Sequence, residues 1–510
     1  MKKTIVIYPF LLALYPILFF FAYNIDEFYF LETIIPMAIS LGATILLWFT
    51  VNVAAKNSHK TGLILSILLV FFFAYPHVYL ALWRIDAFGA WLTNHIFLAP
   101  IWLLICFLCI WRIFRVRKPL EQITKVSNLI TLILISVPLI QLGLHFLINP
   151  EYYNTAQRKK YSALTEEDKI QLAKVTKPAV CPDIYYIIVD GYASNDVLGE
   201  LYSFDNSEFL DFLTQKGFYI ASESQSNYSW TRLSLASSLN FEYLKMDSSG
   251  ALTEKSVSPK RTNSRAAHFL KTLGYKIIYT SSVGNRFSQL NSYADITIEN
   301  DSPPNQFPMA MLEHSGLILL LDIWPDLRKQ DPSLDIKRRN ILNIFEQAGK
   351  IPTNYATIGQ SRVPIFAFIH IYSPHPVYVF DRDGNHIMED PLSQWTVKGH
   401  VEQTIFTNKK LIHLISQILA DLPAPPLIIL QGDHGPLQQH IPGKRISGRM
   451  GILNAYHFPG KKNTGLYQAI SPVNSFRLLF NLYFGTEYPI LKDEGYFSET
   501  DTTNELIKAY

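Results

Sequence analysis

Cysteine is scarce in this chain, which has three among 510 residues. Cys106 and Cys109 lie within an apolar run, and Cys181 is alone in the sequence that follows. The C-terminal part therefore cannot form a disulfide of its own, and its cysteine usage does not fix the redox compartment. The Cys106 and Cys109 spacing matches a CxxC motif, but no second pair accompanies it. We interpret both residues as small apolar helix positions.

An excess of one charge is also missing. The formal net charge is +3, and Lys and Arg form no long tract and no pattern with interleaved aromatic residues. Because such features accompany nucleic-acid binding, we do not expect nucleic acid as a partner. The sequence also has no internal repeat and no low-complexity segment.

Long apolar runs, in contrast, fill the first third of the chain. Five runs are long and apolar enough to span a membrane as helices: residues 4–23, 31–54, 63–83, 95–111 and 129–148. The first run is too long for a signal-peptide core and lacks a small-residue cleavage site, so we expect it to be retained. We predict a transmembrane anchor of about five helices in residues 1–149, a linker or juxtamembrane segment in 150–180 and a large α/β domain in 181–510.

The loop charges predict the orientation of the anchor. Only Arg84 falls in a loop on one side, whereas the other side carries Lys2, Lys3, Lys56, Lys60, Arg112, Arg115, Arg117, Lys118 and Lys125. Because basic loops stay in the cytoplasm, the N-terminus is predicted to be cytoplasmic. An odd number of spans then places the C-terminal domain outside the cytoplasm, whereas an even number would reverse this.

The C-terminal domain alternates strand and helix signals. Short apolar, β-rich runs lie at residues 183–189, 275–279, 365–371, 427–430 and 452–456. Helical patterns lie between them, at residues 206–216, 232–244, 263–273, 404–422 and 473–484. This alternation predicts a three-layer α/β sandwich, and continuous apolar runs such as DIYYIIV fit central strands that are covered on both faces.

Polar residues follow two of these strand signals. Asp190 comes directly after residues 183–189, and Asp433 with His434 comes soon after residues 427–430. Ligands of open α/β sheets gather beyond the carboxyl ends of strands. Carboxylate oxygens with one imidazole suit a divalent metal ion, for which we expect Zn²⁺ or Mn²⁺, with Mg²⁺ as an alternative. Each place alone could be a turn, since Asp-Gly is a common turn dipeptide, but their joint appearance favours a metal site.

Thr231, in the run SNYSWTRLSLASSLN, is the candidate nucleophile. Its hydroxyl is expected where a loop enters a helix, near free backbone N–H groups that favour an anionic ester. A bound cation would lower the pKa of this hydroxyl. The alternative is that Thr231 only caps the helix. The run also contains competing hydroxyls on Ser226, Ser229, Ser234, Ser237 and Ser238.

Two histidines occur in the run IHIYSPHPVY. His370 lies in or at the end of a strand, and His375 follows in a Ser-Pro-His-Pro turn. A single histidine after a buried strand is more often structural. The pair could supply a ligand for a second metal or a general acid for the leaving group.

The order of these motifs resembles the alkaline phosphatase and sulfatase superfamily. The chain has Asp-Gly after the first strand, Thr-x-x-Ser at a helix start, His-x4-His before a Pro-rich turn and Asp-His-Gly after a late strand. Within this superfamily, the motifs resemble those of membrane-anchored phosphoethanolamine transferases and lipoteichoic acid synthases. The resemblance implies five spans in the cell inner membrane and an external, three-layer α/β/α, sulfatase-like (alkaline phosphatase-like) domain with a mixed central sheet.

The resemblance also implies roles for the site residues. Thr231 corresponds to the nucleophile that is transiently phosphorylated, and together with Asp190, Asp433 and His434 it would bind the metal. His370 and His375 correspond to a pair that holds substrate or a second metal. Arg232 follows the nucleophile and is our own candidate for contact with an ester oxygen.

Two departures from the family pattern bear on the subfamily and on the reaction. Asp190 stands where phosphoethanolamine transferases and lipoteichoic acid synthases usually have glutamate, and aspartate is usual in sulfatases and nucleotide phosphodiesterases. Sulfatases need Cys or Ser in a C/S-x-P-x-R context to make formylglycine, and the sequence after Thr231 has neither that Pro nor that Arg. The missing Pro and Arg lead us to favour phosphoryl over sulfuryl chemistry.

The expected function is transfer of a phosphoethanolamine- or phosphoglycerol-type group by a phospho-threonine intermediate. The expected donor is a membrane phospholipid, and the expected acceptor is a lipid or glycan of the cell envelope. One alternative is a sulfatase-like hydrolase of phosphodiesters or sulfate esters. The other is a membrane-anchored binding protein that has no catalytic activity.

Overall fold

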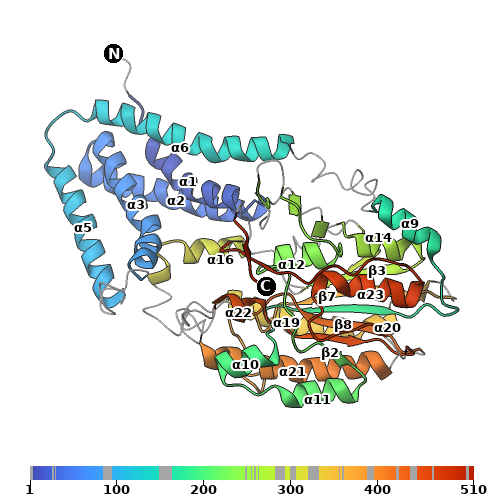
Figure 1. Cartoon of the computed structure of the whole chain (residues 1–510). Helices are drawn as coiled ribbons and strands as arrows, with labels where there is room; N and C mark the ends of the chain where they lie inside the picture. Colours follow the sequence, from blue (N-terminus) through green and yellow to red (C-terminus); the bar gives the residue numbers. More distant parts are fainter. Residues whose placement is uncertain are drawn as a thin grey trace. The chain divides into compact units, whose positions relative to one another are not determined.

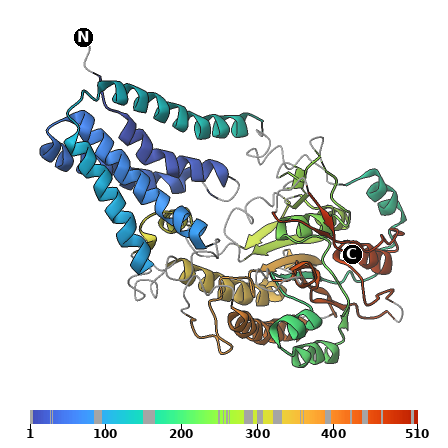
Figure 2. The same cartoon turned by 60° about the vertical axis from the view of Figure 1, so that its left-hand side comes forward.

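The computed structural model describes the chain in two compact units, shown in Figures 1 and 2. One unit contains residues 1–154 and 303–335, and the other contains residues 155–302 and 336–510. All residues are described except 1–3, 26–27, 29, 84–94, 149–163, 247–249, 254–255, 258–259, 262, 282–292, 299–305, 320–331, 355–356, 359–360, 388–395, 421–423, 437–444, 462–463 and 501–504. Arg84 and much of the expected linker therefore lie outside the described residues.

Five apolar helices make up most of the first unit, at the places that the sequence predicted. They are α1 (Tyr8–Tyr23), α2 (Phe30–Ala55), α3 (Ser58–Trp83), α5 (His95–Arg115) and α6 (Glu121–Ile148). Four of them, α2, α3, α5 and α6, are long and apolar enough to cross a membrane. Helix α1 has 16 residues, which is shorter than the roughly 20 residues of a typical span. Each helix contains one internal proline: Pro16, Pro36, Pro76, Pro100 and Pro138.

Polar side chains connect these helices where their backbones need partners. Asn128 of α6 accepts hydrogen bonds from the backbone N–H groups of Ile7 and Tyr8, both at 3.1 Å. These donors lie at the start of α1, where a helix has no internal acceptors for its N–H groups. Trp102 of α5 donates its indole N–H to the Phe71 carbonyl of α3 at 3.0 Å. In an apolar environment such bonds specify which helices pack together.

A segment from the second half of the sequence also belongs to this unit. Helix α16 (Gln306–Glu313) packs against α2, and Phe307 is fully buried. The backbone N–H of Phe307 donates to Glu32 at 3.3 Å, and its ring contacts Phe28 with centroids 5.2 Å apart. His314 stacks against His77 of α3. Residues of the C-terminal part thus complete the core of the helical unit.

A seven-stranded sheet forms the centre of the second unit, with strand order β2-β9-β8-β1-β7-β3-β4. The strands are β1 (Ile184–Val189), β2 (Tyr219–Ile220), β3 (Lys276–Ser281), β4 (Ile296–Ile298), β7 (Ile365–Ile371), β8 (Leu427–Gly432) and β9 (Asn454–His457). Neighbours from β8 to β4 are parallel, and β9 is antiparallel to β8 and β2. The mixed sheet is therefore confirmed. Two short antiparallel pairs lie apart from it, β5 (Thr357–Ile358) with β6 (Ser361–Arg362) and β10 (Tyr496–Phe497) with β11 (Ile507–Lys508).

Helices cover both faces of the sheet, as the predicted three-layer arrangement requires (Figures 1 and 2). On one face, α12 (Thr231–Ser238), α14 (Arg265–Thr272) and α23 (Pro472–Phe484) pack onto the strands in one large apolar core. The opposite face carries α10 (Asn195–Tyr202), α11 (Ser207–Gln215) and α21 (Val397–Ala420). The other helices among the described residues are α9 (Glu166–Lys174), α19 (Pro332–Gly349), α20 (Ile351–Asn354) and α22 (Arg445–Met450).

The three central strands are buried throughout, which explains their continuous apolar runs. Every residue of β1, β7 and β8 is buried. Their register is level at the carboxyl end, where Val189 of β1 pairs with both Ile371 of β7 and Gly432 of β8. Side chains that follow these strands are therefore placed at one edge of the sheet.

Candidate active site

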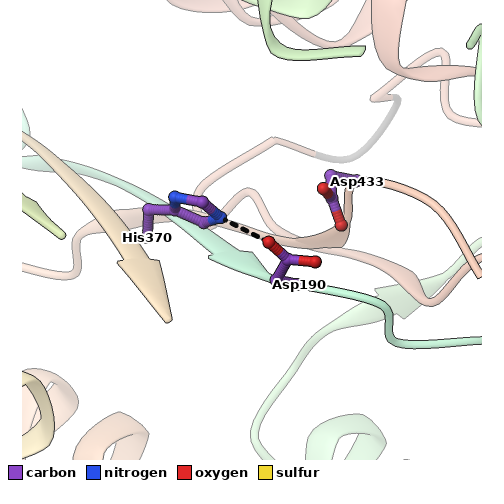
Figure 3. Close-up of side chains that lie close together, drawn as sticks. All are labelled: Asp190, His370 and Asp433. Atoms are coloured by element: carbon purple, nitrogen blue, oxygen red, sulfur yellow. Dashed lines mark hydrogen bonds and ion pairs between the residues drawn. The ribbon is translucent and has the colours of Figure 1, made fainter. Parts of the chain in front are cut away.

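Three predicted site residues meet at the carboxyl edge of the central strands (Figure 3). Asp190 follows β1, His370 is the last but one residue of β7, and Asp433 follows β8. One potential ligand atom from each residue lies within 4.8 Å of the other two. His370 Nε2 is 3.2 Å from Asp190 Oδ2. Because β1 lies between β7 and β8, strand pairing itself brings these side chains together.

The two carboxylates each have one buried oxygen that no polar group satisfies. Asp190 is 1% exposed and Asp433 is fully buried. Among the described residues, Asp190 Oδ1 and Asp433 Oδ2 have no hydrogen-bond partner. Asp433 Oδ1, in contrast, accepts from the backbone N–H groups of Gly191 and His434, both at 3.0 Å. Buried carboxylate oxygens are costly without a partner, so this arrangement fits a divalent cation bound by oxygen and imidazole.

The pKa values of Asp190 and Asp433 show that two negative charges are difficult to hold side by side in this buried site. Burial raises the pKa of Asp433 to about 7, and the nearby Asp190 carboxylate adds to the rise. Burial also acts to raise the pKa of Asp190, but the neighbouring histidines outweigh it and hold that pKa well below its usual value. Two buried carboxyls this close do not ionise together easily. A cation between them would let both ionise.

His434 and Thr231 extend the site beside the carboxylates. His434 Nε2 lies 3.3 Å from Asp433 Oδ2 and 3.8 Å from Asp190 Oδ1. Its Nδ1 lies 3.0 Å from the Gly435 carbonyl, which can only accept a hydrogen bond. The ring proton is therefore on Nδ1, and Nε2 carries a lone pair. Burial lowers the pKa of His434 well below its usual value, which keeps the ring neutral.

The Thr231 hydroxyl contacts this lone pair. Thr231 Oγ1 is 3.0 Å from His434 Nε2. Thr231 is half-buried and is the first residue of α12, whereas the N-cap position belongs to Trp230. The predicted place at a helix start is thus confirmed. The expected helix over residues 232–244 ends earlier, at Ser238.

The competing serine hydroxyls make other contacts. Ser226 Oγ donates to the Asp433 carbonyl at 2.5 Å, and Ser229 Oγ donates to the Ser498 carbonyl at 3.2 Å. Ser237 and Ser238 lie deeper in α12 and are fully buried. Of the hydroxyls in this run, Thr231 is the one with a described hydrogen bond to a side chain of the Asp-His motif, whereas Ser226 bonds to its backbone.

His375 lies beside the same strand ends. Its ring centroid is 6.4 Å from that of His434, and a Cβ placed on Gly191 would lie 3.4 Å from His375 Cα. Nδ1 of His375 contacts the Pro376 carbonyl. Burial lowers the pKa of His375 to about 4. The ring is therefore neutral at neutral pH.

Two basic residues at the site were not predicted from the sequence. Lys337 of α19 donates to the His375 carbonyl at 2.9 Å, and burial lowers its pKa to about 7. Arg449 of α22 is 2% exposed and donates to the Ser229 and Gly435 carbonyls. No motif marks either one, because each reaches the site from a helix outside the motifs; Arg449 lies 14 residues after Gly435. Arg232, our candidate contact for an ester oxygen, is half-buried in α12.

Comparisons with known proteins give structural likeness only. No protein-family model and no curated protein matches the chain. The chain is similar to the C-terminal periplasmic domain of EcEptC from Escherichia coli, with 12% identity and a TM-score of 0.42 over 66% of this chain and 94% of that chain. It is also similar to the lipoteichoic acid synthase LtaP from Listeria monocytogenes, with 13% identity and a TM-score of 0.38 over 63% of this chain and 78% of that chain.

A third similar structure is the soluble domain of lipooligosaccharide phosphoethanolamine transferase A from Neisseria meningitidis. Its identity to this chain is 11% and the TM-score is 0.35, over 61% of this chain and 91% of that chain. A lipoteichoic acid synthase and a phosphoethanolamine transferase are the kinds of protein that the sequence motifs resemble.

Proposed function

We propose that this protein is a membrane-anchored, metal-dependent transferase that moves a phospho-substituent from a membrane lipid to an acceptor of the cell envelope. The transferred group would be of the phosphoethanolamine or phosphoglycerol type, and Thr231 would carry it between the two steps. One observation above all supports this proposal. The Thr231 hydroxyl lies 3.0 Å from His434 Nε2, beside two buried carboxylates that each have an unsatisfied oxygen.

The residues that would hold the metal are Asp190, Asp433 and His434, with Thr231 Oγ1 as a further ligand. His370 borders the same carboxylates and can act as an additional ligand or hold the substrate. When bound, a divalent cation would lower the pKa of the Thr231 hydroxyl and neutralise charge on the ester. Zn²⁺ and Mn²⁺ suit this donor set, and Mg²⁺ is the alternative.

The first step forms a bond between Thr231 Oγ1 and the phosphorus of a phosphodiester and breaks the bond to the leaving oxygen, while the Thr231 proton passes to His434 Nε2 or, when that nitrogen binds the cation, to solvent. The start of α12 presents backbone N–H groups that favour the anionic ester. The lone pair of His434 Nε2 accepts a hydrogen bond from the Thr231 hydroxyl and orients it. The same lone pair can bind either this hydroxyl or the cation, but not both at once. His375 is neutral in this state, and a bound anion would raise its pKa toward a form that can protonate the leaving oxygen.

In the second step an acceptor hydroxyl attacks the phospho-threonine and regenerates Thr231. The anchor fits a lipid donor, because it holds the domain at the surface where such a donor lies. With water as acceptor, the same site would be a phosphodiesterase, and with a sulfate ester it would be a sulfatase-like hydrolase. The products distinguish these reactions.

The proposed function is tested by following the covalent intermediate. Purified full-length protein is mixed with a phosphodiester lipid, and intact mass is measured at short times, with bound metal measured in parallel. We expect an adduct on wild-type protein and on Thr231→Ser, but none on Thr231→Ala. Thr214→Ala serves as a matched control, because Thr214 is an exposed threonine of α11. Wild-type protein with no adduct and no metal would support a non-catalytic binding protein instead.

We further propose that the N-terminus is cytoplasmic and that the α/β unit is extracytoplasmic. The basic loop residues described after α2 and α5 support this orientation. The number of spans decides the outcome, because α1 is shorter than the four helices that meet the length of a span. Single cysteines placed in the loop after α5 and on the surface of the α/β unit can be labelled in intact cells. Labelling at the loop but not at the α/β unit would show the opposite orientation and contradict this proposal.

A further inference from the structure

Arg449 is a buried arginine of α22 that joins two parts of the candidate active site. Its Nε donates to the Ser229 carbonyl at 2.6 Å, and its Nη1 donates to the Gly435 carbonyl at 2.7 Å. Ser229 lies in the loop that leads into α12, and Gly435 lies in the turn that carries Asp433 and His434. One guanidinium therefore connects the loop of the nucleophile to the turn of the Asp-His motif.

The two carbonyls are close in sequence to the groups that meet in the site. Ser229 is two residues before Thr231, and Gly435 follows His434 directly. Peptide units are planar, so only a few backbone and side-chain torsions separate the Ser229 carbonyl from Thr231 Oγ1, and the Gly435 carbonyl from the His434 ring. The guanidinium that holds both carbonyls is planar as well. A shift of either carbonyl would change the 3.0 Å distance from Thr231 Oγ1 to His434 Nε2.

The Gly435 carbonyl also determines which nitrogen of His434 is protonated. It accepts from His434 Nδ1 at 3.0 Å and from Arg449 Nη1 at 2.7 Å. A carbonyl oxygen has two lone pairs, so both bonds can form together. The bond from Nδ1 leaves the lone pair of Nε2 directed to Thr231. By fixing the Gly435 carbonyl, Arg449 indirectly helps to hold the His434 imidazole in this orientation.

The surroundings leave Arg449 little freedom. The backbone N–H of Gly435 donates to the Arg449 carbonyl at 2.7 Å, which makes the contact reciprocal. A Cβ at Gly435 would lie 2.1 Å from the Gly448 carbonyl oxygen, so the turn presses directly on α22. The guanidinium carbon lies 5.2 Å from the ring centroid of Trp230, the residue before Thr231. The guanidinium is thus held by the Ser229 carbonyl, the Gly435 carbonyl and the Trp230 ring.

We propose that Arg449 is a positioning residue that sets the spacing between Thr231 Oγ1 and His434 Nε2. This inference rests on the proposed function of Thr231. Lysine would keep the charge, but a single ammonium cannot reproduce the planar fork that holds two carbonyls. The rate of phosphoryl transfer should therefore depend on the shape of the guanidinium, whereas binding of the ester should depend on its positive charge, which lysine keeps.

The test measures kcat and KM of full-length protein in detergent with bis(4-nitrophenyl) phosphate as the probe. A displacement of about 1 Å near reacting atoms costs about 10²-fold in rate, and we expect kcat of R449K and R449A to fall by that order. We expect KM of R449K, which keeps the charge, to change by less than about threefold, and KM of R449A, which loses the charge, to rise further. Added guanidinium chloride at tens of millimolar should restore part of the kcat of R449A but none of that of R449K, whose ammonium fills the space.

R445M is the matched control on the same helix. Arg445 pairs with Glu499 at the surface, with its Nη1 2.9 Å from Glu499 Oε1, and makes no described contact with Thr231 or His434. This variant should keep the wild-type kcat. Thermal melts of all variants show whether each is folded, and R449K carries the test alone if R449A does not fold.

Wild-type kcat in R449K would overturn the inference, because charge alone would then be sufficient. A folded R449A with low kcat that guanidinium does not restore would also contradict a positioning role. T231A separates this inference from the proposed function on which it rests. If T231A is as active as wild type, then the proposed function of Thr231 fails, whatever the Arg449 variants show.

Discussion

A buried ion pair holds helix α9 against the rest of the α/β unit, and its removal should destabilise this helix. Asp168 of α9 is fully buried and Arg265 of α14 is 3% exposed. Asp168 Oδ2 accepts from Arg265 Nε at 2.9 Å, and Oδ1 accepts from Arg265 Nη2 at 2.6 Å. Asp168 also accepts from the Thr165 backbone N–H and from the Tyr488 hydroxyl, both at 2.7 Å.

Replacing Asp168 with Asn keeps the shape of the side chain but removes its charge. The amide group can no longer accept both bonds of the Arg265 fork, so a buried guanidinium loses its main partner. Breaking a buried pair from one side costs about 3–5 kcal/mol. Glu242 lies 3.3 Å from Arg265 Nη1 and offsets part of this cost, so we expect about 3 kcal/mol.

Hydrogen exchange of the amides in α9 measures this change in the full-length protein. At about 1.4 kcal/mol per factor of ten, a loss of about 3 kcal/mol speeds exchange through local opening by about 150-fold. Lys169→Met is the matched control in the same helix, because the Lys169 and Glu166 pair is mostly exposed. Removing an exposed pair should cost about 0.5 kcal/mol or less.

The same pair predicts a dependence on pH with a definite sign. Burial acts to raise the pKa of Asp168, but the hydrogen bonds and charge of Arg265 outweigh it, so the pKa in the folded protein is below its usual value. A lowered folded pKa contributes stability above the unfolded pKa, and that stability is lost as pH falls through the folded pKa. Wild-type α9 should therefore lose protection below about pH 4, and Asp168→Asn should lack this component. Equal exchange of α9 in both proteins at pH 7 would refute the reasoning.

Three further predictions concern the metal site, the turn after β1 and the helical unit. Chelation should abolish phosphodiester cleavage, and Asp433→Asn should prevent its recovery when Zn²⁺ is added, as measured by activity and bound metal. Gly191→Ala should lower kcat and cost about 1–2 kcal/mol in thermal melts, because Gly191 has φ +75 and faces His375. Phe307→Ala should destabilise the helical unit by about 3 kcal/mol or more in detergent melts, because its ring is fully buried.

Much of the α/β unit was predictable because its central strands have a clear sequence pattern. Strands covered on both faces read as continuous apolar runs, and all five expected strands are present at β1, β3, β7, β8 and β9. Strands β2 and β4 have two and three residues, too few for a pattern to stand out. Helix α19 was also missed.

The helical unit shows a different limit of sequence reasoning. Apolar length placed its helices correctly, but nothing in residues 306–319 indicated that they would pack with the N-terminal helices. Helix α16 has eight residues and is too short to resemble a membrane span. Its place depends on Phe307 fitting among aromatic side chains of helices hundreds of residues earlier, and such a contact has no local signal.

The candidate site divides in the same way. Asp190, Asp433 and His434 were predictable because strand ends carry function in open α/β sheets. His370 lies within β7, and its place beside Asp190 follows from the pairing of β7 with β1. Arg449 could not be predicted, since its role depends on how α22 folds back against the Asp-His turn.

The balance of charge in the site argues for the kind of ester it would accept. Asp190 and Asp433 supply two buried carboxylates, and Arg449 supplies one positive charge, because burial lowers its pKa only to about 10. A divalent cation would therefore leave the site with one net positive charge, which matches the single negative charge of a phosphodiester. Lys337 adds only a fractional charge near neutral pH, because its pKa is about 7. A phosphomonoester dianion would leave an uncompensated charge unless Lys337 became fully protonated, so the site should prefer diesters, and this preference should be stronger at pH 8 than at pH 6.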